Sequence, residues 1–253
     1  MLAVIGGRAH INGITFVTNT HIVRGKLAHG TVSINIRRLP WQWVFNQMDK
    51  VPFLRGVARL IKLLNHKLLL ASIFLLAIPW DRIFPYNKLV VTESVVLELA
   101  FYGFPLILSV VLLKRLWQFH GAEHKVLNSY MKGGDLSLSA VRKASRVSER
   151  CGTNVIVIAF PFIILLYYVM IPGIILVVAL LLGFKVIKWR PRNNWLKPAT
   201  WLASFIQKYI VTAEPTDAQI ELAIATLSRA IEYDGSQTFF GSVKILRFPH
   251  QVG

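Results

Sequence analysis

The sequence predicts a mainly α-helical, multi-pass membrane protein with about four transmembrane helices, a small cytoplasmic β-meander and C-terminal amphipathic helices. Two properties of the chain lead to this prediction. Of its 253 residues, 54% are hydrophobic and only 16% are charged, which is too apolar for an ordinary soluble chain of one or two domains. In so apolar a chain, the formal net charge of +17 is typical of membrane topology and of contact with anionic lipid.

Three long apolar runs are the candidate membrane spans. They are LLLASIFLLAIPW (68–80), LVVTESVVLELAFYGFPLILSVVLL (89–113) and NVIVIAFPFIILLYYVMIPGIILVVALLLGF (154–184). The third run contains no Asp, Glu, Lys or Arg, and it is longer than the roughly 20 residues that one spanning helix needs. Because Pro172 and Gly173 divide it, we interpret it as two helices joined by a tight turn. One long tilted helix, giving three spans in total, is the alternative.

The distribution of basic residues predicts the orientation of these spans. The termini and the loop at 114–150 together hold 27 of the 29 Lys and Arg residues, whereas the loop at 81–89 holds 2. Because basic residues concentrate on the cytoplasmic side of a membrane, both termini are predicted to be cytoplasmic and the protein to lie in the cell membrane. No secretory signal is expected, since Gly, Arg and His soon interrupt the first apolar residues.

The segments outside the spans predict sheet and amphipathic helices. Between residues 8 and 38, short runs rich in Thr, Val and Ile alternate with period two between turn residues, which indicates a β-meander, and the C-terminal TFFGSVKILRF could add a strand to it. The predicted organisation is 1–50, a cytoplasmic β-rich segment; 51–113, the first transmembrane pair; 114–153, a cytoplasmic helical loop; 154–187, the second transmembrane hairpin; and 188–253, amphipathic helices and a strand.

Two amphipathic helices are expected in the C-terminal segment. Apolar residues recur on one helical face between 196 and 210, which suits either a helix in the membrane interface or one packed on the cytoplasmic part. In TDAQIELAIATLSRAI, Thr216 is followed three residues later by Gln219. That spacing is the signature of a capping box and predicts the start of the second helix.

The stretch FHGAEHKVLN (119–128) carries the residues best suited to chemistry. In a helix, His120 and His124 project from the same face, so both imidazoles could reach one Zn²⁺. Glu123 lies beside them, where it could act as a general base toward water, and the order H-x-x-E-H is that of the inverted zinc-peptidase motif. The alternative is that both histidines lie on an exposed helix face and bind no metal.

Cys151, the single cysteine, is the most obvious third ligand, and its neighbour Arg150 would favour the thiolate. The glycines at 133–134 are expected to end the first helix, and a serine at 137 or 139 to cap a second helix that returns the chain. We therefore expect the imidazole nitrogens and the sulfur within about 4 Å of one another. The alternative is that the cysteine packs as a small apolar residue.

Several segments resemble the YqhQ family, bacterial multi-pass membrane proteins of unknown function that are sometimes described as predicted metal-dependent enzymes. The segments are the Gly6-Gly7 start, VPFLRGV (51–57), HGAEHKVLNSY (120–130), LSLSAVRKASRVSERCGTN (136–154) and IVTAEPTDAQIELAIATL (210–227). The resemblance spans nearly the whole chain. It implies membership of the family more firmly than it implies any chemistry.

The chain departs from the family pattern at two places. The family usually has His-Pro before Arg-Cys-Gly-Thr, where this chain has Ser148 and Glu149, and it usually has a Glu where this chain has Asn12. If the family's His and Cys residues form a metal site, this chain lacks one ligand. Two histidines and a cysteine would still suffice for an open catalytic zinc, and Glu149 could substitute. The same differences would also be expected in a chain that has lost activity.

Three functions follow from these observations. The first is a membrane-embedded, metal-dependent hydrolase with its site at the cytoplasmic membrane surface. The second is a non-enzymatic accessory or scaffold whose basic face docks on the ribosome, the translocon or anionic lipid; its residues are Arg142, Lys143, Arg146 and Arg150. The third is a transporter, since Glu98 lies within an apolar run.

Overall fold

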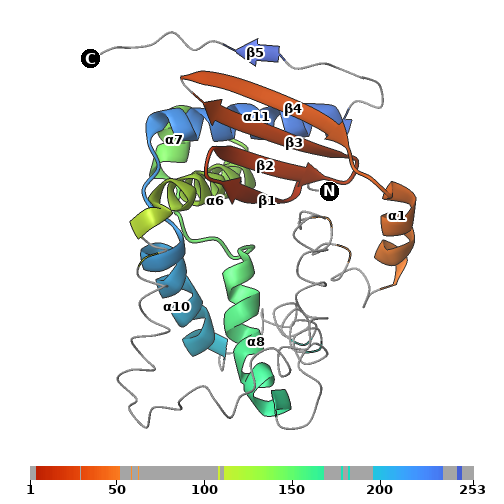
Figure 1. Ribbon diagram of the computed structural model, residues 1–253, viewed down its shortest axis with the longest axis vertical. Coiled ribbons are helices and arrows are strands. Elements are labelled where there is room, and N and C mark those ends of the chain that lie inside the picture. Colours follow the sequence, from red (N-terminus) through yellow and green to blue (C-terminus); the bar gives the residue numbers. More distant parts are fainter. Residues whose placement is uncertain are drawn as a thin grey trace, which may run out of the picture.

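The computed structural model describes residues 4–28, 30–51, 111–167, 196–235 and 244–246, together with the single positions 58, 62, 108, 178 and 182. The described part consists of an antiparallel sheet, helices packed on the sheet, and two further helices that lie below it in Figure 1.

The sheet is a meander in which each strand pairs with the next along the chain. Its order is β1-β2-β3-β4-β5 and all pairs are antiparallel (Figure 1). The strands are β1 (Val4–His10), β2 (Gly13–Thr18), β3 (His21–Ala28), β4 (Thr31–Arg38) and β5 (Lys244–Leu246). The meander thus occupies the segment where period-two patterning predicted it, and the C-terminal segment adds the fifth strand.

One face of the sheet forms the main core with two long helices. Alternation along the strands places Ile14, Phe16 and Val23 on this face, and all three are fully buried. They pack against α6 (Lys114–Gly133) and α11 (Asp217–Gly235). The short helix α7 (Leu138–Lys143) contacts both α6 and α11. The helix α6, which carries the His-Glu-His motif, is therefore fixed directly beneath β1 and β2.

The helix α11 begins where the capping box predicted. The Thr216 backbone N–H donates to the Gln219 side-chain oxygen at 2.9 Å, and the Gln219 N–H donates to the Thr216 hydroxyl at 3.4 Å. These two bonds satisfy backbone donors that the first turn of a helix leaves unpaired. The start of α11 was therefore readable from the sequence.

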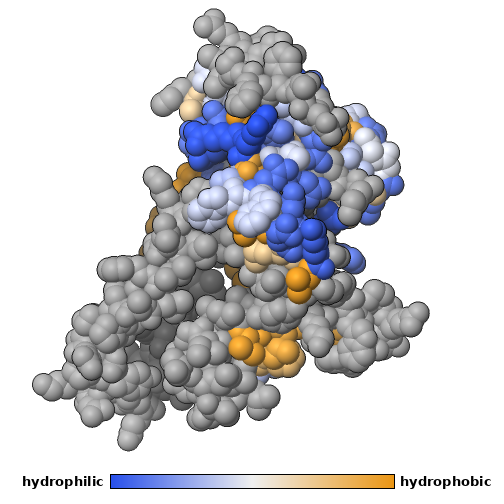
Figure 2. All heavy atoms as spheres, turned by 90° about the vertical axis from the view of Figure 1, so that its right-hand side faces the viewer, coloured by the Kyte–Doolittle hydropathy of each residue, from blue (hydrophilic) through white to orange (hydrophobic). Residues whose placement is uncertain are grey.

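The remaining helices extend away from the core. The helix α1 (Gln42–Lys50) buries Phe45 near Val17, on the opposite face of the sheet. Below the sheet, α8 (Gly152–Tyr167) packs beside α10 (Lys197–Ile206), which continues as the π-helix η4 (Gln207–Val211). Seen from the α1 side, the described residues at the level of the sheet are mostly hydrophilic, whereas those lower down are mostly hydrophobic (Figure 2).

The predicted fold class is wrong in its membrane part. Among the described helices, none is both long and apolar enough to cross a bilayer. The helix α8 (Gly152–Tyr167) covers the start of the third apolar run. The described fold is instead a sheet packed against helices.

The localisation as a multi-pass protein of the cell membrane is corrected together with the fold class. That prediction depended on interpreting three apolar runs as membrane spans, and no helix among the described residues is long and apolar enough to be one. The apolar residues of the main core come from other segments of the chain. The run at 68–80, most of the run at 89–113 and most of residues 168–184 lie outside the described residues.

Candidate metal centre

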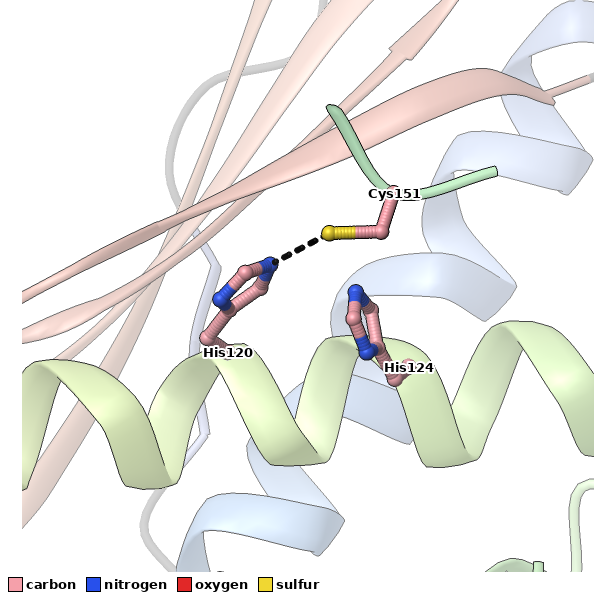
Figure 3. A group of neighbouring side chains, drawn as sticks. All are labelled: His120, His124 and Cys151. Carbon is pink, nitrogen blue, oxygen red and sulfur yellow. Dashed lines mark hydrogen bonds between the residues drawn. The ribbon is translucent and has the colours of Figure 1, made fainter. Parts of the chain in front are cut away.

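Three potential metal ligands converge above one face of α6. His120 and His124 are one helical turn apart and their ring centroids are separated by 4.4 Å. Cys151 comes from the loop before α8, and its sulfur points toward both rings (Figure 3). One ligand atom from each residue lies within 4.8 Å of the others, slightly wider than the expected separation of about 4 Å.

After α6, the chain passes through the short helix α7 and returns to the side of α6. Gly134 ends α6 in the left-handed conformation, with φ of 71°, and Ser137 caps α7 by accepting a hydrogen bond from the Ala140 N–H. The Asn128 side chain then donates to the carbonyls of Ser145 and Val147, both at 2.8 Å. These bonds hold the 145–151 segment against α6 and place Cys151 opposite the histidines.

Backbone carbonyls fix the orientation of both imidazoles. The Nδ1 atom of His120 bonds the Val211 carbonyl at 2.8 Å, and Nδ1 of His124 bonds the Arg146 carbonyl. Because a carbonyl only accepts, each Nδ1 must carry the proton, which leaves both Nε2 lone pairs available. The Nε2 atom of His120 lies 3.8 Å from the Cys151 sulfur. This tautomer and orientation are those of metal-binding histidines.

Burial keeps all three groups uncharged. It lowers the pKa of His120, although the Val211 bond opposes the shift, and it lowers the pKa of His124 to about 3. Burial also raises the pKa of the Cys151 thiol, so the thiolate expected from the neighbouring Arg150 is not favoured by the protein alone. Two neutral imidazoles meet the requirement for coordination, whereas the thiol must lose its proton to a metal.

An ion pair between the buried Lys125 and the exposed Glu214 helps to fix the carbonyl group to which His124 is hydrogen-bonded. The Lys125 ammonium is almost fully buried and lies 2.7 Å from Glu214 and 2.6 Å from the Arg142 carbonyl oxygen. Glu214 also pairs with Arg146 at 3.1 Å. The 142–146 segment is therefore tied to α6 at two points, which fixes the Arg146 carbonyl beside the ring of His124.

The π-helix η4 holds His120 and the segment that carries Cys151 in position. Its last residue provides the Val211 carbonyl to His120. Its first residue, Gln207, is fully buried, and the side-chain oxygen accepts a hydrogen bond from the Ser148 N–H at 2.8 Å. Short π-helical turns occur frequently at functional sites. No local sequence pattern singles out Gln207, so sequence reasoning missed it.

Gly121, the second residue of the HGAEHK motif, permits a close approach. A Cβ atom there would lie 2.2 Å from the Ala213 carbonyl oxygen, and the Ala213 N–H donates to the Trp117 carbonyl at 2.9 Å. Only glycine lets this segment pass so close to α6 and bring Val211 to His120. A glycine inside an expected helix is a signal of close packing, which the sequence interpretation did not use.

The residues at which the chain departs from the family pattern lie outside the ligand cluster. Ser148 is buried, and its hydroxyl accepts a hydrogen bond from the Arg150 N–H at 3.3 Å. Glu149 is exposed. Asn12 lies in the turn between β1 and β2, where its carbonyl accepts from the Leu27 N–H. Among the described residues, only the two histidines and the cysteine group as potential metal ligands.

Glu123 lies on the side of α6 that faces β1. Its carboxyl group is buried, which raises its pKa to about 8, and its charge contributes to the raised pKa of Cys151. An adjoining pocket of about 260 Å³ is lined by Gly7, Arg8 and Ala9 of β1 and by Leu116, Trp117, His120 and Glu123 of α6. The predicted base and one predicted ligand therefore share a pocket, as a reaction at a metal centre would require.

Gly7 leaves the space that the Glu123 carboxyl group occupies. A Cβ atom at position 7 would lie 2.8 Å from Oε1 and 2.9 Å from Cδ of Glu123. We expect Gly7→Ala to destabilise the fold by about 1–3 kcal/mol through overpacking, and the loss to shrink when Glu123 is also alanine. Denaturant unfolding of the two single variants and the double variant measures this coupling. An equal loss in both backgrounds would show that the two side chains do not compete for space.

Comparisons with known proteins agree with the resemblance seen in the sequence. The family model described as "Protein of unknown function (DUF1385)" matches residues 68–233. The chain is 24% identical over 302 residues to the "Uncharacterized protein YqhQ" of Bacillus subtilis (strain 168), which covers 90% of this chain and 92% of that protein. No solved structure matches. The chain therefore belongs to the DUF1385 family, the YqhQ-like proteins of unknown function.

Proposed function

We propose that the protein is a metal-dependent hydrolase in which His120, His124 and Cys151 hold a zinc ion and Glu123 is the general base. The observation that carries the proposal is the convergence of the three ligand atoms within 4.8 Å, with both histidines oriented by backbone carbonyls. Packing alone does not explain why the Nε2 atoms of two buried histidines point toward the same buried thiol.

The residues fit a zinc ion in number, type and spacing. Two ligand atoms of a tetrahedral zinc lie about 3.3–3.6 Å apart when the metal bonds are about 2.0–2.3 Å long. The separation of 3.8 Å between the His120 Nε2 atom and the Cys151 sulfur is close to this value, and the cluster as a whole must contract by about 1 Å. Three protein ligands leave a fourth position open, as in catalytic zinc sites.

The residues of the pocket would transfer the proton and surround the reacting groups. A bound zinc ion would polarise a carbonyl group and activate water beside it. Glu123 shares the pocket with His120. Because its pKa is raised to about 8, its carboxylate form, which predominates above that pH, can take a proton from that water and return it to the leaving group. On the side of β1, the wall of the pocket is formed by Gly7, Arg8 and Ala9.

The experiment that tests this function compares the native chain with Glu123→Gln. Both are expected to bind about one zinc per chain, because Glu123 is not one of the three ligands. Hydrolysis of a panel of peptide and ester probes should fall by about 100-fold or more in the variant, the usual contribution of a positioned general base. Equal hydrolysis by both proteins, or none by the zinc-loaded native chain, would contradict the proposal.

The two other functions have less support from the described residues. In the basic face expected of a scaffold, Arg142 pairs with Asp217 and Arg146 pairs with Glu214, so two of its charges are compensated within the protein. Anionic lipid, the ribosome and the translocon remain predictions as partners. The deep carboxylate expected of a transporter, Glu98, lies outside the described residues.

A further inference from the structure

In the part of the chain that the structure describes, the strand β1 forms one edge of the sheet, and it borders the pocket beside His120. In the described sheet β1 pairs only with β2. The outer residues Gly7 and Ala9 line the pocket from the sheet side, and His120 and Glu123 line it from α6. An unpaired strand edge presents backbone donors and acceptors to any extended chain that reaches it.

The hydrogen bonds between β2 and β3 show which backbone groups of β2 are left to face β1. The Leu27 N–H donates to the Asn12 carbonyl at 2.8 Å, next to the paired residues of β2 and β3. Along an antiparallel strand, the backbone groups of successive residues point alternately to the two sides. The even-numbered residues of β2 therefore bond β3, and the odd-numbered residues bond β1.

The same alternation identifies the free groups of β1. Arg8 is paired with the odd-numbered Thr15, so its backbone groups point toward β2. The backbone N–H and C=O groups of its neighbours Gly7 and Ala9 then point away from β2, toward the pocket. No hydrogen bond joins the backbone of either residue to another element in the described part of the chain.

We propose that the substrate is a polypeptide that binds in extended conformation along β1 as an added antiparallel strand. The free N–H and C=O groups of Gly7 and Ala9 would bond the main chain of this peptide, as in other cases of strand addition to a sheet edge. Gly7 has no side chain and that of Ala9 is a single methyl group, so β1 itself presents few side-chain atoms to a peptide beside it; the space next to the Gly7 Cα is filled by the Glu123 carboxyl group.

The inference rests on the proposed function for its chemistry. An extended chain on β1 would pass the pocket that His120 and Glu123 line. Hydrolysis would break the amide C–N bond and form a C–O bond from water. Glu123 would take one proton from the water and give it to the leaving nitrogen, so that the products are a carboxylic acid and an amine.

The test measures peptide binding without turnover. Fluorescent octapeptides with blocked ends are titrated into the full chain carrying Glu123→Gln, with zinc and after treatment with EDTA. We expect binding in both conditions, weaker without zinc, because the bonds to β1 come from the backbone alone. If the native chain binds no zinc, the proposed function is overturned, but the binding of the octapeptides to β1 can still be measured.

Two substitutions at Ala9 distinguish backbone from side-chain contacts. Ala9→Pro removes the outward N–H and places the ring in the groove, at a position on an edge strand that tolerates proline. It should weaken peptide binding by at least tenfold, whereas Ala9→Gly keeps the N–H and should bind nearly as the parent does. Circular dichroism and zinc content confirm that each variant is folded.

The peptide can be changed instead, so the test does not depend on the folding of a variant. Replacing one peptide amide by an ester removes a single N–H donor and should weaken binding by about threefold to tenfold where that donor meets β1. The inference is overturned if no octapeptide binds, if Ala9→Pro and Ala9→Gly bind equally well, or if ester substitution has no effect at any position.

Discussion

Replacing His124 with alanine is expected to abolish the binding of zinc. The two histidines and Cys151 form the only group of potential metal ligands among the described residues, and removing one leaves too few for a stable site. Zinc content of the purified protein should fall from about one ion per chain to a trace. His124 is 2% exposed, so the lost ring also leaves a cavity and should lower the free energy of unfolding by about 2–4 kcal/mol.

A second histidine variant separates loss of the metal from general damage. His10 lies on β1 and bonds the Thr15 hydroxyl at 2.9 Å, outside the ligand cluster. His10→Ala should retain the full zinc content. Retention of zinc by His124→Ala would show that the metal is bound elsewhere. An equal loss in both variants would show that the effect of His124→Ala is not specific to the ligand cluster.

Gly121→Ala is expected to destabilise the protein and to weaken zinc binding. The added methyl group would lie 2.2 Å from the Ala213 carbonyl oxygen, and backbone cannot move aside as a flexible side chain can. The segment must shift away from α6, which costs about 1–3 kcal/mol. The Val211 carbonyl would move with it and release the ring of His120. Urea unfolding and zinc titration measure the two effects.

The same helix offers a matched control. Gly133 lies in the last turn of α6, and a Cβ atom there meets nothing within 4 Å. Alanine is the better helix former by roughly 1 kcal/mol, so Gly133→Ala should be neutral or stabilising and should leave zinc affinity unchanged. If Gly121→Ala behaves in the same way, the close approach of the Ala213 segment does not hold the site.

Local patterns in the sequence were sufficient for the meander and for the start of α11. Period-two alternation between turn residues depends only on neighbouring positions, and so does the Thr216–Gln219 capping box. The transmembrane prediction failed because hydrophobicity reports that a segment avoids water, not what covers it. The high overall hydrophobicity includes core residues such as Ile14 and Phe16, which α6 and α11 cover.

The candidate site was predictable to the extent that it depends on spacing. His120 and His124 are one turn apart, which fixes their common face in any helix, and the single cysteine was the obvious third member. The carbonyls of Val211 and Arg146 that orient the rings are 91 and 22 residues away from their partners. A backbone carbonyl has no sequence signature, so the positioning groups, Gln207 among them, could be found only in the fold.

X-ray absorption at the zinc edge tests the central claim most directly. The full chain loaded with one equivalent of zinc should show one sulfur at about 2.3 Å and two imidazole nitrogens at about 2.0–2.1 Å. Because Cys151 is the only cysteine, the sulfur contribution should vanish in Cys151→Ser while nitrogen ligands remain. Coordination by oxygen alone, or a spectrum that Cys151→Ser leaves unchanged, would contradict the proposed metal centre.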